Sequence, residues 1–282
     1  MNEGMPARAF LWGLLAAGVL IVWPWCLGWM QARRPGWFSR ATVPTREAFG
    51  ALWRCGERES PRVLLAWTAL AGAAALLPLG NGWQAADLDA GLLWLLVLAV
   101  VALTGLSLRP TEVARAAGGL LTLTLCLAPL VLRTAGLHLG DLGVAQVGGV
   151  GNWFLLRDPF LLAGAAIYLC AVAALWPAPP SSSAGDRDGL FAASLRAGLP
   201  LVLAHLFTVA YLGAWWAFVP ALDGLTWLQT GLKTAVVLGV VLWLRRCPAW
   251  SATAHLAWRL PLAALGACVG AAIWLAATGA AL

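Results

Sequence analysis

Charged side chains are scarce in this sequence. Only 11% of the 282 residues are Asp, Glu, Lys or Arg, whereas 61% are hydrophobic, and the mean hydropathy is +0.82. This composition excludes an ordinary soluble domain and indicates an integral membrane protein. The net charge of +6 does not predict nucleic-acid binding, because the basic residues are distributed by membrane side and are not gathered on one soluble face.

Patterns that bind metals or haem are also missing. The six cysteines form no CxxC pair and none lies at metal-ligand spacing from a histidine, so we expect no zinc or iron–sulfur site in this chain. Of the three histidines, only His205 falls within a predicted span, whereas a bis-histidine haem needs two imidazoles at one depth. We therefore expect His205 to form a hydrogen bond across a helix interface, and we expect no cofactor bound by these residues.

Carboxylates are absent from the predicted spans. All twelve acidic residues fall in loops or at span ends, so the chain lacks the spaced ionisable groups of a transmembrane proton path. Two basic residues do lie inside spans. Arg196 is near enough to a span end to extend its head to the interface. Lys233 either has a functional or partner-pairing role or extends to the outer headgroups.

Apolar runs near the bilayer-crossing length of about 20 residues predict the fold class. It is all-α: a polytopic bundle of about eight transmembrane helices in one integral membrane domain, 1–282. The first run has no small-residue cleavage site, so we expect no cleavable signal peptide. The eight runs are 9–29, 63–80, 91–108, 116–137, 154–176, 190–216, 225–244 and 260–280.

Arginines alternate in density between successive loops. Segments 30–62, 108–115, 177–196 and 245–259 hold fourteen arginines, whereas the opposite side has only Arg8, Arg133 and Arg157. The positive-inside rule places the first set in the cytoplasm and both termini outside. Within this pattern, 177–189 is low in complexity and predicts a flexible cytoplasmic linker.

The longest polar segment, 30–62, predicts a cytoplasmic amphipathic loop. Within it, 45–58 fits a short helix with Phe49, Leu52 and Trp53 on one face and arginines on the other. Such a helix would lie in the membrane interface, with its arginines toward lipid phosphate or a docked partner. The alternative is a solvated loop that only obeys the positive-inside rule. The residues expected to dock a partner are Gln31, Arg33, Arg34, Arg46, Arg54 and Arg58.

The order of several motifs resembles a known family over nearly the whole chain. The family is membrane subunit 1 of complex I, the NADH-quinone oxidoreductase, with its relatives in formate hydrogenlyase and membrane-bound hydrogenases. The similar positions are Gln31, Arg33, Arg34, Pro35 and Gly36 after the first span; Gly91, Leu92 and Leu93; Asp141, Leu142, Gln146 and Trp153; Leu212, Gly213, Ala214 and Trp215; and Lys233, Thr234, Arg245, Arg246, Trp258, Arg259 and Pro261.

The chain departs from this family where the family places its acidic residues. The family's fifth span leads into a segment like E-x-x-R-x-P-F-D and an acidic loop, which help to form its quinone chamber and the start of its proton path. Here the aligned positions are Val172, Leu175, Pro177 and Pro179, and Arg196 stands where the family has a glutamate early in the sixth span. The resemblance therefore implies that the scaffold is kept and the acid chemistry is lost.

The resemblance implies a non-catalytic membrane component of an oxidoreductase complex. It would anchor a peripheral redox arm on the cytoplasmic side next to antiporter-like membrane subunits, within the lipid bilayer. One alternative is a stand-alone polytopic permease or assembly factor. Another keeps a degenerate quinone site between the first and sixth spans. The intramembrane polar or quinone-chamber candidates are Arg196, His205 and Lys233.

Overall fold

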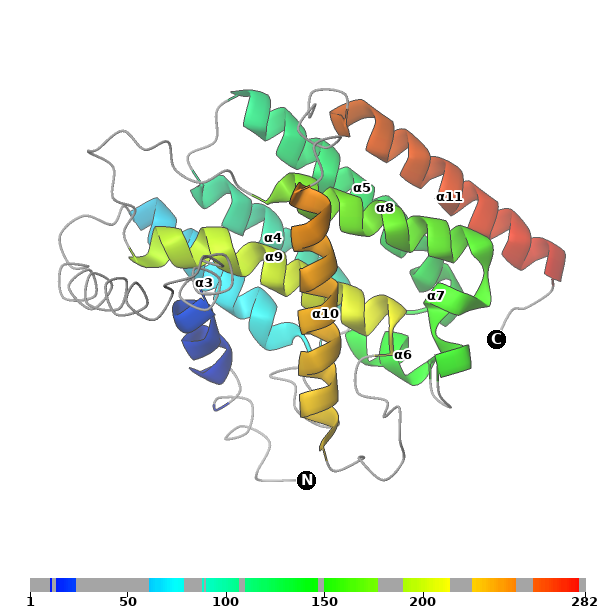
Figure 1. Ribbon diagram of the computed structural model, residues 1–282, viewed down its shortest axis with the longest axis horizontal. Helices are drawn as coiled ribbons and strands as arrows, with labels where there is room; N and C mark the ends of the chain where they lie inside the picture. The colour runs from blue at the N-terminus through cyan, green and yellow to red at the C-terminus, as the bar shows by residue number, and fades with distance from the viewer. Residues whose placement is uncertain are drawn as a thin grey trace, which may run out of the picture.

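Every regular element in the described part of the chain is a helix, which confirms the all-α class there (Figure 1). The computed structural model describes residues 14–23, 61–78, 90–106, 110–146, 150–176, 190–213, 225–246 and 256–278, with Leu11 and Leu88. The predicted amphipathic helix 45–58 and the linker 177–189 lie outside these residues.

Within the described residues, four helices are long and apolar enough to cross a membrane. They are α5 (Pro110–Thr134), α9 (Leu190–Tyr211), α10 (Thr226–Arg246) and α11 (Leu256–Thr278). Four shorter apolar helices are Leu14–Trp23, α3 (Pro61–Leu76), α4 (Gly91–Gly105) and α8 (Pro159–Leu175). The chain therefore has the character of a membrane protein. Each predicted apolar run overlaps one of these helices, but a helix of 15 to 17 residues is shorter than the about 20 that cross the hydrocarbon core, so eight spans stays a prediction.

The fifth predicted span, 154–176, is divided at Asp158. Phe154–Arg157 forms the single turn α7, and α8 begins at Pro159. The Asp158 carboxylate accepts hydrogen bonds from the backbone N–H groups of Phe160 and Leu161, and Pro159 occupies the first turn. An acidic N-cap followed by proline starts a new helix, because the cap satisfies N–H groups that have no partner within the helix. The short helices α6 (Leu139–Val144) and η1 (Val150–Asn152) precede α7 in the connection from α5.

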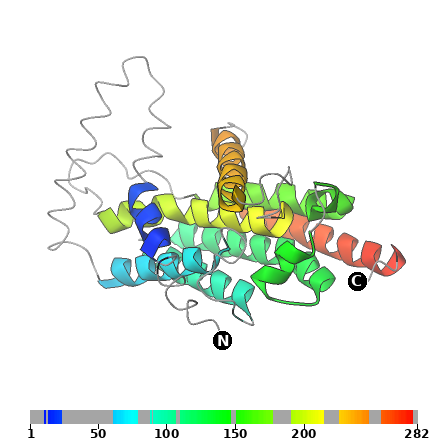
Figure 2. The same cartoon turned by 90° about the horizontal axis from the view of Figure 1, so that it is seen from below.

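Helix α9 packs against α3 on one side and against α10 on the other. Helices α5, α8 and α11 pack against one another. Figure 1 and Figure 2 together show α10 lying across the face of α8 and α9, on the side opposite to α3 and α4. This arrangement leaves much of α10 exposed, including Leu232 and Val236, which are 63% and 61% exposed.

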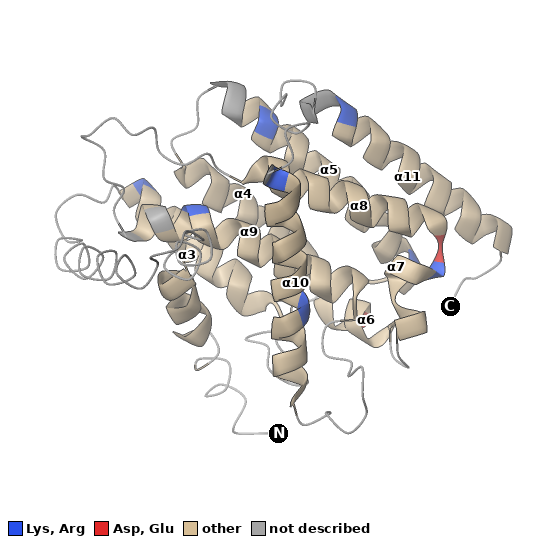
Figure 3. Cartoon of the chain, in the orientation of Figure 1, with Lys and Arg blue, Asp and Glu red and all other residues tan. Residues whose placement is uncertain are grey.

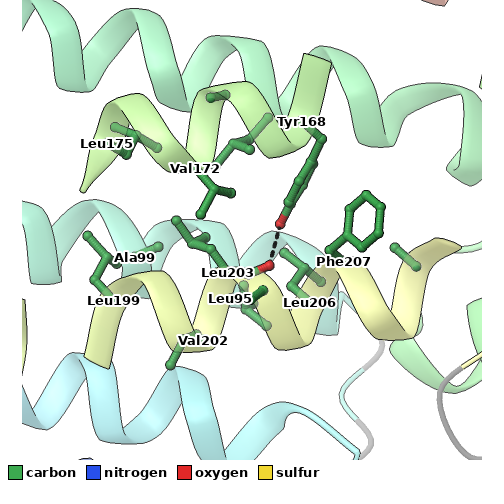
Figure 4. Packing of buried hydrophobic residues seen from close by; sticks show 14 of the residues in the cluster. Leu95, Ala99, Tyr168, Val172, Leu175, Leu199, Val202, Leu203, Leu206 and Phe207 are labelled. Atoms are coloured by element: carbon green, nitrogen blue, oxygen red, sulfur yellow. Dashed lines mark hydrogen bonds between the residues drawn. The ribbon is translucent and has the colours of Figure 1, made fainter. Parts of the chain in front are cut away.

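The core between α4, α8 and α9 is apolar with a few hydroxyl groups (Figure 4). Tyr168 is fully buried, and its hydroxyl donates to the carbonyl oxygen of Leu203 at 2.9 Å. This bond satisfies the one polar group that the tyrosine brings into the core. Val172 and Leu175, at positions where the resembling family has its acidic segment, are buried in the same cluster.

Hydrogen bonds attach helix 14–23 to α9. The Ser194 hydroxyl donates to the carbonyl of Leu20 at 2.6 Å and accepts from Trp67 Nε1 at 2.9 Å. Trp23 Nε1 donates to the carbonyl of Ala197 at 2.8 Å. Interhelical polar contacts of this kind help to hold apolar helices together, since apolar burial alone gives little driving force in lipid.

Several described basic residues lie near helix ends on one side of the molecule, whereas Lys233 lies within α10, Arg133 lies at the other end of α5, and Arg157 lies in α7. Figure 3 shows blue positions near the ends of α3, α5, α9, α10 and α11 on the same side, and a red and blue pair on the far side next to α7. Asp158, which follows α7, forms an ion pair with Arg133 of α5, with 2.6 Å between Oδ2 and Nη2. The basic residues of the first group are Arg62, Arg115, Arg196, Arg245 and Arg259.

Candidate functional site

The site begins where α9 ends. After Tyr211, Gly213 adopts φ +55°, the left-handed conformation that commonly stops a helix and that glycine adopts without strain. A Cβ atom at this position would lie 3.1 Å from Gln146 Cβ and 3.3 Å from Trp153 Cδ1. Both the backbone angle and the close neighbours therefore favour glycine at this position.

Gln146 binds the last turn of α9. It is fully buried, and its Nε2 lies 3.1 Å from the carbonyl oxygens of both Val209 and Ala210 and 2.8 Å from that of Leu142. Its Oε1 accepts a hydrogen bond from the backbone N–H of Phe154. The amide thus satisfies carbonyls that have no partner within α9, and it ties the connection before α8 to this helix end.

Lys233, the only lysine in the sequence, binds the same helix end from α10. Its Nζ donates to the carbonyl oxygens of Leu212 at 2.9 Å and Gly213 at 3.1 Å. The ammonium also lies 5.0 Å from the centre of the Trp153 ring, within the range of a cation–π interaction. Lys233 is buried in this position, with 4% of its surface exposed.

These contacts define an α9 terminal cluster of Gln146, Trp153, Gly213 and Lys233. The carbonyl end of a helix carries a partial negative charge, so a cation bound there is favourable, and more so where little water competes. The cluster joins α9, α10 and the connection between α5 and α8. Its chemistry is that of a charged helix cap: it fixes where three segments meet.

The other intramembrane candidates lie in α9. His205 Nε2 is 3.0 Å from the carbonyl oxygen of Pro78, which gives the hydrogen bond across a helix interface that the sequence predicts. Since a carbonyl only accepts, Nε2 carries the proton of this ring. Arg196 is half-buried near the N-terminal end of α9, far along the helix from the cluster. The structure therefore brings Lys233 to the cluster, but not Arg196.

The docking candidates fall in the segment between helix 14–23 and α3. Gln31, Arg33, Arg34, Arg46, Arg54 and Arg58 all lie outside the described residues. Within the described ranges, no group of three or more His, Cys, Asp or Glu side chains is placed to hold a metal ion.

Two features of the connection between α5 and α8 are contacts that the sequence did not predict. Gln146 and Trp153 entered the sequence analysis only through the resemblance, although a glutamine and a tryptophan in a short apolar connection indicate buried polar contacts. Arg133 and Asp158 are two separate charges near the ends of predicted spans in the sequence-based topology, and the structure joins them. The Asp-Pro sequence at 158–159 is typical of a helix start, so it was the signal in the sequence that Asp158 caps α8.

Comparison with models of known protein families gives no match for this chain.

Proposed function

We propose that this chain is a membrane anchor, similar to membrane subunit 1 of complex I, in a complex-I-like or energy-converting hydrogenase-like respiratory assembly. In this role it docks a peripheral redox arm to the cytoplasmic side of the membrane and lies beside antiporter-like membrane subunits. It crosses a bacterial inner membrane eight times, with both termini outside. It binds no cofactor of its own and carries no catalytic residue.

One observation carries the proposal. Three motif segments of the resemblance, which are far apart in the sequence, meet at the α9 terminal cluster. Residues 141–153 contribute Gln146 and Trp153, residues 212–215 contribute Gly213, and residues 233–234 contribute Lys233. Because the residues of these three motifs contact one another, they depend on one another in packing. Their joint presence in one chain therefore supports the resemblance.

The loss of carboxylates supports an anchoring role rather than quinone or proton chemistry. Val172 and Leu175 stand at family positions of the acidic segment and are 0% and 6% exposed in an apolar core. No acidic side chain can replace them there without a partner. The basic positions near the ends of α3, α5, α9, α10 and α11 on one side of the molecule (Figure 3) support the orientation, because cytoplasmic loops are enriched in arginine.

The alternative is a stand-alone permease or assembly factor. Lys233 and the bends between helices would then line a solute path. A degenerate quinone site between the first and sixth predicted spans is a third interpretation. The alternatives differ from the anchor in one respect that can be measured: a permease has no soluble redox partner.

Replacement of Arg46, Arg54 and Arg58 together by Gln is expected to release the peripheral arm. Three partly desolvated ion pairs of about 1 kcal/mol each would together weaken docking about 100-fold. The measurement is the amount of soluble redox protein that co-purifies with the tagged chain from native membranes, with the monodispersity of the membrane chain as a check on folding.

A matched control replaces Arg109, Arg187 and Arg246 by Gln in the other arginine-rich segments. It removes the same number of arginines but keeps those of segment 30–62, so the partner should stay bound. Retention of every partner by the variant in segment 30–62 would show that the segment is only a topology signal, and the permease would then be the better explanation.

A further inference from the structure

A groove opens on the side of the molecule between helix 14–23 and α10. It encloses a cavity of about 240 Å³. Its floor comes from the C-terminal end of α3 with the residue that follows it, and from α9: Leu77 and Val202 are 1% and 2% exposed. Its mouth lies between Val19, which is 46% exposed, and Ala235, which is also exposed.

Large aliphatic side chains are exposed on both helices that flank the groove. On helix 14–23, the lining residues Leu15 and Val19 are 48% and 46% exposed, and on α10, Leu232 and Val236 are 63% and 61% exposed. Exposed apolar surface of this extent is typical of a face in contact with hydrocarbon. In a membrane, the molecules at the mouth of this groove are therefore lipid chains.

The polar hydrogen atoms of His205 and Thr234, which line the groove, already take part in hydrogen bonds within the protein. His205 Nε2 donates to the Pro78 carbonyl, and the Thr234 hydroxyl lies 2.9 Å from the Thr230 carbonyl. Neither therefore offers a proton to the carbonyl of a quinone head. A hydrocarbon chain needs no such donor, and the remaining lining is apolar.

The volume suits a chain rather than a solvent molecule. An engineered apolar cavity of about 150 Å³ stays free of water and holds benzene, and this groove is larger. If the groove were empty, the atoms that line it would lack van der Waals contacts on one side. A hydrocarbon chain in the groove supplies those contacts.

We propose that this groove is a binding site for one acyl chain of a membrane phospholipid. The chain enters between helix 14–23 and α10 and covers the floor formed by α3 and α9. The inference rests on the membrane location in the proposed function but not on the redox assembly. A phospholipid can bind here whether or not a peripheral arm docks.

The wild-type chain gives the first test. A phospholipid with a photoreactive diazirine in its acyl chain is incorporated into native membranes, and the labelled residues are mapped by peptide mass spectrometry. We expect adducts on the floor residues Leu77 and Val202 as well as on Trp243, which is 63% exposed and serves as a positive control for bilayer contact. Adducts on Trp243 with none on the floor would overturn the proposal.

A matched pair of variants gives the second test. Ala235→Phe fills the groove, whereas Val236→Phe places the same ring on the outward face of the next residue. Extraction and mass spectrometry of the purified chain should give one phospholipid fewer per chain in Ala235→Phe than in wild type, and no loss in Val236→Phe. Equal lipid in all three proteins contradicts the proposal, and so does a bound isoprenoid quinone that only Ala235→Phe loses.

Failure of this proposal and failure of the proposed function are distinguishable. Lipid content is measured on the membrane chain alone, and docking is measured by co-purification of a soluble redox protein. A chain that holds phospholipid in the groove but never binds a soluble partner would keep this inference and remove the anchor role.

Discussion

Replacement of Gly105 by alanine is expected to destabilise the helix bundle strongly. A Cβ atom at this position would overlap the Ala66 Cβ, and it would also crowd Leu195 Cδ2 at 3.3 Å. The Ala66 Cβ is attached directly to the backbone of α3, so it cannot rotate away and the two helices must separate. Overpacking in a core typically costs about 1–3 kcal/mol, and we expect the upper end here.

The measurement is the free energy of unfolding, or the midpoint of thermal unfolding, in detergent. Gly239→Ala in α10 is the matched control, because a Cβ at Gly239 meets no atom within 4 Å. Alanine is the better helix former by about 1 kcal/mol, so this control should be neutral or slightly stabilising. If the two variants unfold alike, the close contact of α3 and α4 is wrong.

Replacement of Lys233 by methionine is expected to give the second large loss of stability. Methionine keeps an unbranched side chain but cannot donate to the carbonyls of Leu212 and Gly213. Two buried acceptors at the end of α9 then lose a charged donor, and a hydrogen bond to a charged group is worth about 1.5–3 kcal/mol. We therefore expect a decrease of about 3 kcal/mol in the free energy of unfolding, measured in detergent.

Thr234→Val provides the comparison at the neighbouring residue. It removes a hydroxyl that bonds within α10 and to Thr208 at 3.3 Å, and it leaves the ammonium in place. The loss should therefore stay near about 1 kcal/mol. A stable Lys233→Met variant that loses the activity of the assembly would instead show that the lysine acts in function and not as a cap.

The sequence predicts the helices better than it predicts their ends. Each apolar run coincides with a described apolar helix, because the length that crosses a bilayer is a strong constraint on composition. The break at Asp158 was missed because an apolar run continues on both sides of the Arg-Asp-Pro segment, and run length alone does not reveal a cap.

The α9 terminal cluster could be predicted only in part. Lys233 is conspicuous in sequence, since an ionisable residue inside a span needs a partner. Its partners are backbone carbonyls of another helix end, and no side-chain pattern can reveal those. The groove was not predictable either, because it depends on how helix 14–23 and α10 flank α9 and α3.

Carbodiimide cross-linking in native membranes tests the anchor role most directly. The reagent joins carboxylates to amines, and segment 30–62 contains Glu47, Glu57 and Glu59 but no lysine. We predict links from Glu47 or Glu57 to lysines of a soluble iron–sulfur or hydrogenase-like protein on the cytoplasmic side. Links only to the amine of phosphatidylethanolamine, with no soluble protein attached to the chain, would contradict a docking role for this segment.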